Sequence, residues 1–282
     1  MLDIREVKNE LLVLSELKTL VETYQEIAAT RMRKIKSSVL LTREYLTGLN
    51  EVFQQIRYFY KKGRYKSVPR GNGKTVSVLL SANTMLYGDI IRKNFERFAN
   101  DILSESCDAA IVGRVGYKMY KSAQQQLPAA AYFDFSDSGS DPTNLKKLIN
   151  HVIKYDKIRV YHGQFKDILA QVPQKTLISE ELISQADTIR QNELYIFEPS
   201  LSQIMAFFES QILASVFEQT VYESNLSKFA SRMINLDVAT EHINKKIYSV
   251  GMQSQLTKHK IAGTKQMTLL SGVLRSGGGV WA

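Results

Sequence analysis

The chain has 282 residues, of which 44% are hydrophobic and 23% charged, so it can bury a core in one large domain or two smaller ones. No apolar run approaches the ~20 residues of a membrane span, and the acid-containing N-terminus (Asp3, Glu6, Glu10) lacks the pattern of a signal peptide. The single cysteine, Cys107, excludes an internal disulfide framework. These features predict a cytosolic-side protein in a reducing compartment.

The net charge is +9, and the basic residues are unevenly distributed. A basic chain fits nucleic acid, an anionic membrane surface or acidic protein partners. After Glu241 no Asp or Glu occurs, whereas basic residues continue to Arg275. This acid-free end predicts either contact with acidic neighbours or a solvated basic face, and the pattern favours neither.

The N-terminal part carries an apolar or small residue at every seventh position, as in one strand of a coiled coil. No proline occurs before Pro69, which allows one long helix from about Asp3 to Tyr60. A four-residue step in the series is a stutter, which unwinds the supercoil locally without ending the helix. The series is Val7, Leu14, Val21, Ala28 and Ile35, then Val39, Leu46, Phe53 and Tyr60.

The middle of the chain alternates between apolar runs and amphipathic segments. After a Gly-rich basic loop or hairpin at 61–75, we expect helices at 87–103, at 117–125 and from Pro142, capped by Asp141, to about 154. Strands are expected at 76–81, 109–113, 131–135, 157–162, 175–178 and 194–197. This alternation favours a three-layer α/β domain with an at least partly parallel sheet.

This middle part shows no recognisable catalytic, cofactor or metal constellation. Gly73-Lys74-Thr75 lacks the earlier glycine and the following helix of a phosphate-binding loop, and no G-x-G-x-x-G follows the first strand. We therefore expect no cofactor, no metal and no catalytic residue, with nucleic acid only a minor alternative because no aromatic and basic sheet face is visible. Structural roles explain the isolated groups better: His151, His162, Cys107, Asp134, Asp137 and Asp141.

From Pro199 to about Leu274 the chain predicts a second helix, on the order of 110 Å long. Ser200 and Gln203 have the spacing of a capping box. Two interleaved seven-residue series form an apolar seam, namely Leu226, Met233, Thr240 and Ile247 with Phe229, Leu236, Ile243 and Val250. We expect the two ends of the chain to pair as an antiparallel shaft; an ordinary helical bundle is the alternative.

In order and spacing these pieces resemble the gamma subunit of F-type ATP synthases. Ala230–Thr240 (ASRMINLDVAT) is similar to the family's ARMxAMDxAT signature, and Ile27–Arg33 to its VAAAKLR stretch. Shorter likenesses are Tyr195–Pro199 to YxxEP, Ile111–Arg114 to xxGRKG, Tyr161–Phe165 to YNxF, and Ser271-Gly272 to SGA. Two segments depart from the family: the SDRGLCGGxN loop, of which Ser81 and Gly88 remain, and RQxxIT.E, replaced at Lys258–Lys265. The chain looks like a divergent paralogue.

The resemblance implies a long antiparallel coiled coil of N- and C-terminal helices with a Rossmann-like α/β middle domain. It implies shaft helices at 1–62 and 199–275, an α/β domain at 63–198 and a flexible tail at 276–282.

As to function, the resemblance implies a non-catalytic rotor, peripheral at the cytoplasmic face of a bacterial inner membrane or at an organellar equivalent. Its partners would be the alpha and beta subunits of the catalytic hexamer, the epsilon subunit and the membrane c-ring, without nucleic acid and without membrane insertion. The expected partner contacts are Arg31, Arg33, Arg232, Asp237, Lys258, His259, Lys260 and Lys265. A coiled-coil rotor or adaptor of a specialised ATPase-driven machine, and an α/β enzyme with helical extensions, stay as alternatives.

Overall fold

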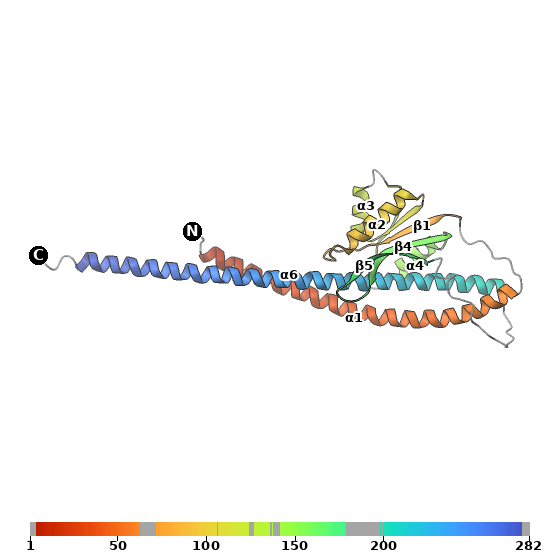
Figure 1. Cartoon of the computed structure of the whole chain (residues 1–282), viewed down its shortest axis with the longest axis horizontal. Helices are drawn as coiled ribbons and strands as arrows, with labels where there is room; N and C mark the ends of the chain where they lie inside the picture. The colour runs from red at the N-terminus through yellow and green to blue at the C-terminus, as the bar shows by residue number, and fades with distance from the viewer. Residues whose placement is uncertain are drawn as a thin grey trace. The chain divides into compact units, whose positions relative to one another are not determined.

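The computed structural model describes residues 4–62, 72–105, 107–123, 127–135, 137, 142–178, 198 and 200–277. They divide into two compact units, one formed by Met1–Ile27 with Leu236–Ala282 and the other by Ala28–Asn235. The long helices α1 (Ile4–Lys62) and α6 (Leu201–Gly277) contribute segments to both units (Figure 1). Helix α6 therefore includes residues 276 and 277, which the sequence assigned to a flexible tail.

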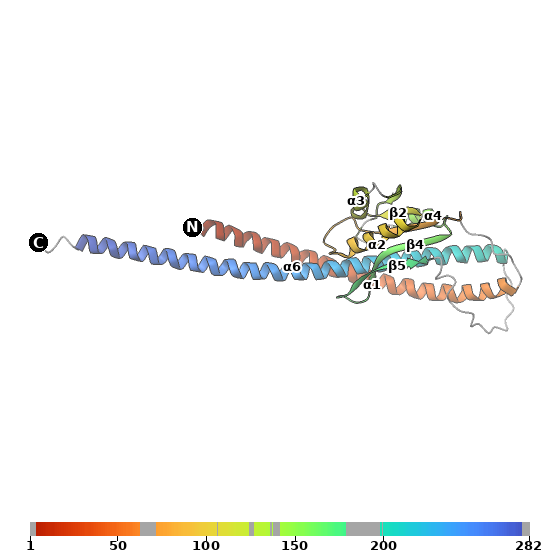
Figure 2. The same cartoon turned by 45° about the horizontal axis from the view of Figure 1, so that its top comes forward.

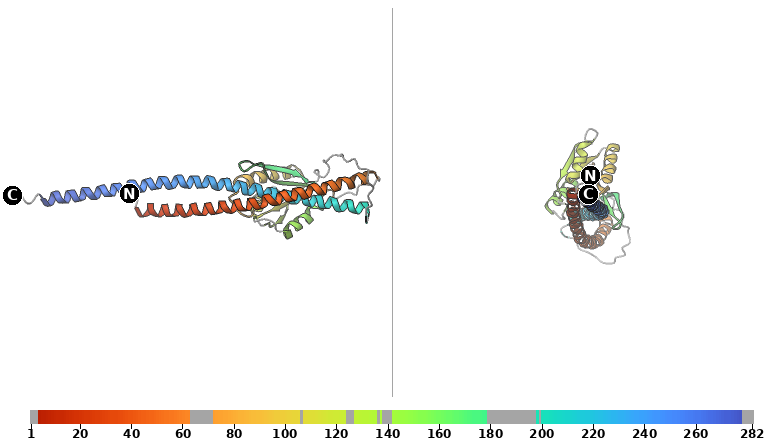
Figure 3. Two further views of the ribbon diagram at one scale, coloured as in Figure 1. Left: turned by 90° about the horizontal axis from the view of Figure 1, so that it is seen from below. Right: turned by 90° about the vertical axis from the view of Figure 1, so that its left-hand side faces the viewer.

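In the smaller unit the segments of α1 and α6 lie side by side (Figure 3). Val21 packs against Leu236 and Ile243 in a buried cluster. Near the start of α1, Glu10 forms an ion pair with Lys246 of α6. Farther along α1, the Gln25 side chain donates to Asp237, which lies nearer the start of α6. Because rising numbers on α1 meet falling numbers on α6, the two segments are antiparallel, as the seven-residue spacing predicts.

In the larger unit most described positions of the predicted seam of the two long helices are also buried, and Met233 is half-buried. Ile35 and Val39, on either side of the four-residue step, are both buried, so the stutter keeps the apolar stripe facing inward. At the start of α6 the Gln203 backbone N–H donates to Ser200 Oγ at 3.4 Å, which confirms Ser200 as the N-cap. The other seam positions buried in this unit are Ala28, Leu46, Phe53, Leu226 and Phe229.

The larger unit also holds a five-stranded sheet in the order β3-β2-β1-β4-β5. Strands β1 to β4 are parallel, and β5 runs antiparallel to β4 (Figure 2). The bounds are β1 Thr75–Leu80, β2 Asp108–Val112, β3 Ala130–Phe133, β4 Lys157–Phe165 and β5 Gln171–Leu177. The strand expected at 194–197 lies outside the described residues.

Strands β4 and β5 are longer than predicted because they form a hairpin. Asp167 Oδ1 accepts the backbone N–H groups of Leu169 and Ala170 at 2.8 and 2.7 Å, which closes the connecting turn. The mixed polar and apolar composition of 163–174 obscures this pairing in the sequence, since a half-exposed antiparallel strand lacks a continuous apolar run.

Three shorter helices complete the domain: α2 (Ile90–Ser104), α3 (Arg114–Ser122) and α4 (Pro142–Val152). Helices α2 and α3 cover one face of the sheet, where Phe98 and Tyr120 pack with Leu79 and Tyr161. Helix α4 and the long helices cover the other face, where Leu148 and Phe217 pack with alternate strand residues: Val76, Val78, Leu80, Ala110, Val112, Ile158 and Val160. The predicted three-layer arrangement is therefore present.

Two of these helices begin away from their predicted starts for local reasons. Helix α2 begins at Ile90 because Gly88 adopts a positive φ and Tyr87 is buried in the preceding loop. Helix α3 begins at Arg114, whose backbone N–H donates to Asn83 Oδ1 at 2.8 Å. The cap predicted at Asp141 lies outside the described residues.

Candidate interaction surfaces

The end of α6 in the smaller unit presents half of the predicted contact residues to solvent. Lys258, His259, Lys260 and Lys265 are all exposed, and so is Asp237, which accepts the Gln25 side chain at 3.4 Å. Large apolar side chains are exposed on the same segment: Leu256, Met267, Leu269, Leu270, Val273 and Leu274. A basic helical end that also exposes this much apolar surface is typical of a segment that another protein covers.

The two predicted residues on α1 differ in their surroundings. Arg33 is exposed, and its guanidinium donates to Thr30 Oγ1 at 3.5 Å. Arg31 is half-buried, with its guanidinium carbon 5.8 Å from the ring centroid of Phe229 on α6. Arg33 is thus available to a partner, whereas Arg31 already interacts with an aromatic ring of its own chain.

Arg232 corrects the sequence prediction, because its side chain is 6% exposed and binds within the larger unit. The guanidinium donates to Thr84 Oγ1 at 2.7 Å and to the Met85 carbonyl at 2.5 Å. Its central carbon lies 3.9 Å from the ring centroid of Tyr87. Arg232 is therefore a residue that holds the Ser81–Gly88 loop, which follows β1, rather than an exposed partner contact.

Lys228, one helical turn before Arg232, is a second buried cation that sequence reasoning missed. Its Nζ donates to the Ser81 carbonyl at 2.8 Å. The pKa of Lys228 is lowered to about 8, mainly by burial; the charge of Asp137 opposes this shift and that of Arg232 adds to it. The i, i+4 spacing of two cations beside the apolar seam was the available signal, although it does not tell buried from exposed.

Asp137 organises the same loop from the opposite side. Its carboxylate accepts the backbone N–H groups of Asn83 and Thr84 at 2.9 and 2.7 Å, and the Thr84 hydroxyl at 2.7 Å. Asp137 therefore has a structural role, as expected, and it acts on a loop 53 and 54 positions away in the chain. Burial and the charge of Asp137 raise the pKa of Tyr87, which closes the loop, to about 12.

His162 and Cys107, in and beside the sheet, contact neighbouring side chains of the same domain. His162 is buried, with one ring nitrogen 2.9 Å from Thr176 Oγ1 and the other 3.2 Å from the Gly163 carbonyl. Its burial lowers the pKa of His162 to about 4. Cys107 is half-buried, and its Sγ lies 3.3 Å from Ser77 Oγ.

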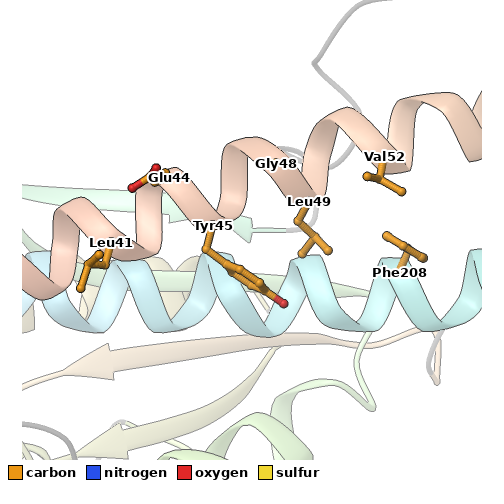
Figure 4. A pocket seen from close by; sticks show the side chains of 7 residues that line it. All are labelled: Leu41, Glu44, Tyr45, Gly48, Leu49, Val52 and Phe208. Atoms are coloured by element: carbon orange, nitrogen blue, oxygen red, sulfur yellow. The ribbon is translucent and has the colours of Figure 1, made fainter.

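A second apolar surface lies between α1 and α6 in the larger unit. It is a groove of about 540 Å³ along one side of α1, with Phe208 contributed by α6 (Figure 4). Gly48 deepens the groove, because no atom lies within 4 Å of the position that a Cβ would take. The lining residues are Leu41, Glu44, Tyr45, Gly48, Leu49, Val52 and Phe208.

Among the residues that the structure describes, no helical stretch is both long and apolar enough to cross a membrane. Within the same residues, His, Cys, Asp and Glu side chains do not gather in a group of three that could hold a metal ion.

Comparison with known proteins identifies relatives over almost the whole chain. A gamma chain of ATP synthase from Geotalea daltonii is 22% identical over 286 residues, covering 96% of this chain and 98% of that protein. The ATP synthase gamma chain of Bdellovibrio bacteriovorus is 23% identical, covering 87% of this chain and 89% of that protein.

Solved structures share the fold. A chain of the Euglena gracilis mitochondrial ATP synthase matches with a TM-score of 0.66 at 13% identity, covering 99% of this chain and 96% of that one. A chain from the structure of the central stalk and c-ring of the Tetrahymena thermophila mitochondrial ATP synthase matches with a TM-score of 0.54 at 17% identity, covering 78% of this chain and 99% of that one. A sequence model of the family described as ATP synthase matches residues 3–258. The chain therefore belongs to the ATP synthase family, as a relative of its gamma chains.

Proposed function

We propose that this chain is the central rotor shaft of an F-type ATP synthase or ATPase. It couples rotation of an ion-driven membrane ring to ATP synthesis or hydrolysis in a hexamer of alpha and beta subunits. The single observation that carries the proposal is the antiparallel pairing of α1 and α6 within each unit, in a chain matched by the family from residue 3 to 258. An epsilon subunit and a membrane c-ring complete the proposed set of partners.

The proposed role is non-catalytic. A shaft acts on catalytic subunits through contacts that differ between their conformations, because a partner shifts an equilibrium only by its differential affinity for the two states. The exposed, acid-free end of α6 supports this role, since it offers basic and apolar side chains to surrounding subunits. We propose that the complex lies at a bacterial inner membrane, or at an organellar equivalent, with this chain as a peripheral subunit.

The groove that contains Gly48 supports a further part of the proposal. An apolar concavity on paired helices suits a subunit that turns together with the shaft, because burial there gives lasting affinity. We assign it to the epsilon-type subunit or the ring. Basic residues at the end of α6 suit the stationary hexamer better, since exposed ion pairs contribute only ~0–1 kcal/mol each and can break and re-form as the shaft turns.

The composition of the native complex tests the proposal. We expect the tagged chain to co-purify with alpha-type and beta-type subunits, identified by mass spectrometry, and the isolated chain to hydrolyse no ATP. Purification without any such subunit, or robust hydrolysis by the chain alone, refutes the proposal.

A charge-reversal variant tests the surface. Replacing Lys258, Lys260 and Lys265 by Glu together is expected to weaken ATP-driven ion pumping or hexamer retention, because the basic surface becomes acidic. The matched control, with an equal change in charge on the α/β domain, is Lys146→Glu, Lys147→Glu and Lys166→Glu, all exposed positions. Equal pumping and retention in the two triple variants would remove the three α6 lysines from the contact surface.

The rotor or adaptor of a specialised ATPase-driven machine is the second candidate. It is favoured by Lys265, which stands where the resembling family has an acidic residue. A complex that contains the alpha-type and beta-type subunits, but other proteins in place of ring subunits, would support this candidate over an ATP synthase.

A further inference from the structure

We propose that the cavity between helix α6 and the carboxyl ends of β1 and β2 binds one small anion, of the size and charge of chloride. Lys228 supplies the positive charge of this site, and the hydroxyl groups of Ser81 and Ser224 supply neutral donors. The bound anion ties the α/β domain to α6. The site lies inside the larger unit, so the proposal does not depend on the proposed function.

The cavity is small and is lined by both polar and apolar side chains. Its volume is about 20 Å³, which is enough for one water-sized occupant, whereas a phosphate or a carboxylate ligand needs more room. Side chains of β1, β2 and α6 form the apolar walls. The polar lining residues, all of them buried, are Ser81, Asp137, Ser224, Asn225 and Lys228.

Two serine hydroxyl groups at the cavity have no hydrogen-bond partner among the residues that the structure describes. Ser81 is 2% exposed and Ser224 is 1% exposed, so solvent outside the protein does not reach either oxygen. Burying a hydroxyl group without a partner costs free energy, and buried polar groups in native proteins are nearly always hydrogen-bonded. The two serines therefore indicate an occupant that forms hydrogen bonds.

The surroundings of the cavity carry an excess of positive charge. The Lys228 ammonium group has three N–H donors, and the acceptor that the described residues supply is the Ser81 carbonyl, at 2.8 Å. The charges of Asp137 and of Arg232, which is also buried, both act on Lys228. Two cations thus face one carboxylate, and a buried charge without a counterion is unfavourable.

Asp137 lines the cavity, but its carboxylate oxygens bind the loop that follows β1. They accept the backbone N–H groups of Asn83 and Thr84 at 2.9 and 2.7 Å, and the Thr84 hydroxyl at 2.7 Å. The charge of Asp137 balances one of the two cations, while its lone pairs are occupied by these donors. The second cation still requires an anion, and the cavity beside Lys228 has room for one.

A water molecule and a small anion would use these groups differently. Water would form hydrogen bonds with the two hydroxyl groups, but it would leave the positive charge of the interior unbalanced. An anion accepts hydrogen bonds from Lys228, Ser81 and Ser224 and also cancels that charge, and burial of an unpaired charge is costlier than burial of a neutral group. Because the volume admits only one water-sized species, a halide is the matching occupant.

Bromide locates the anion directly, because it replaces chloride and scatters X-rays anomalously. Crystals of the full-length chain soaked in sodium bromide should show an anomalous peak within hydrogen-bond distance of Lys228 Nζ. An empty cavity, or a water molecule there without anomalous signal, overturns the proposal. Bromide in the cavity without the effect of chloride on stability described next would be an adventitious ion only, and would overturn the proposal too.

Chloride should stabilise the full-length chain against urea at pH 7, compared with sodium gluconate at equal ionic strength. We expect a saturable rise of roughly 0.5 M in the urea midpoint when chloride reaches about ten times its Kd. At about pH 9.5 the rise should nearly vanish, because Lys228, with a pKa of about 8, has lost its proton while Asp137 and Arg232 keep their charges. Equal midpoints in the two salts at pH 7, or the same rise at both pH values, contradict the proposal.

Two variants assign the effect to this cavity. Lys228→Met should lose both the bromide peak and the response to chloride. Ser224→Ala, which removes one donor and adds no atom, should raise the chloride concentration for half the response at least threefold. The matched control is Ser227→Ala, since Ser227 is also buried and without a partner among the described residues of the chain but lies outside the cavity lining; it should leave that concentration unchanged. Equal responses in the two serine variants refute the proposal.

Discussion

Replacing Lys228 by Met removes a buried cation while it keeps most of the side-chain volume. Two effects oppose each other. The variant avoids burying a charge, but it leaves the Ser81 carbonyl without the N–H donor that now lies 2.8 Å away. An unpaired buried acceptor costs about 1–3 kcal/mol at every pH, whereas the cost of the buried charge depends on pH.

The pKa of Lys228 falls from 10.5 to about 8 on folding, mainly through burial. At 1.36 kcal/mol per pKa unit, this shift is a cost of about 3 kcal/mol. Below about pH 8 the folded and unfolded chains both carry the proton, and the full cost is present. Between about pH 8 and 10.5 the unfolded chain keeps a proton that the folded chain has released, so the free energy of unfolding rises with pH.

We therefore expect the wild-type chain to gain up to about 3 kcal/mol over Lys228→Met as the pH rises from about 7 to about 10.5. Urea unfolding at a series of pH values measures the difference. Asp137 and Arg232, the charged neighbours of Lys228, are present in both proteins, and Tyr87, with a pKa of about 12, stays protonated. Exposed Lys258→Met is the control. Parallel stability curves for wild type and Lys228→Met would refute the reasoning.

Three further predictions follow from burial and backbone geometry. Phe229→Ala should lower the free energy of unfolding by about 3–5 kcal/mol in urea, because a fully buried ring is lost, whereas exposed Phe207→Ala should change it by less than about 0.5 kcal/mol. Gly113→Ala should destabilise the chain by more than about 1 kcal/mol, because φ is 93° and the new Cβ would lie 2.8 Å from the Ala82 backbone; Gly263→Ala, in open helix, should raise the thermal midpoint. Stability should fall by about 3 kcal/mol between about pH 6.5 and 4, where the unfolded chain protonates His162 and the folded chain does not, and His162→Gln should lack this part of the fall.

The helical seam could be predicted because its signal is local and repeated. Val21, Ile35, Val39 and Leu236 each lie at a seven-residue spacing, and each is buried. Strands with continuous apolar runs, such as β1 and β2, could be located for the same reason. Their parallel pairing could be predicted because a helix lies between successive strands in the sequence, which is typical of a parallel sheet.

The inward position of Arg232 could not be predicted from local pattern. Its acceptors on Thr84 and Met85 are 148 and 147 positions away in the chain. In the seven-residue repeat Arg232 lies next to seam residues. This position is equally compatible with a buried side chain and with an exposed cation that flanks the seam. Only the tertiary placement of the Ser81–Gly88 loop decides between the two, which is also why the role of Lys228 was missed.

Helix α6 occupies the position at which open α/β sheets usually bind a ligand. In open α/β sheets, ligands bind at the carboxyl ends of the strands where the strand order reverses, which in this sheet lies between β1 and β4. Here Lys228 of α6 binds the carbonyl of Ser81, immediately after β1, and a side chain at Gly163 of β4 would collide with Ser227 of α6. The position that receives a small molecule in other α/β proteins thus receives a helix of the same chain. The α/β domain is therefore attached to α6 through the sheet edge that holds the ligand in other α/β proteins. Contacts of this domain with a partner must then use its other surfaces.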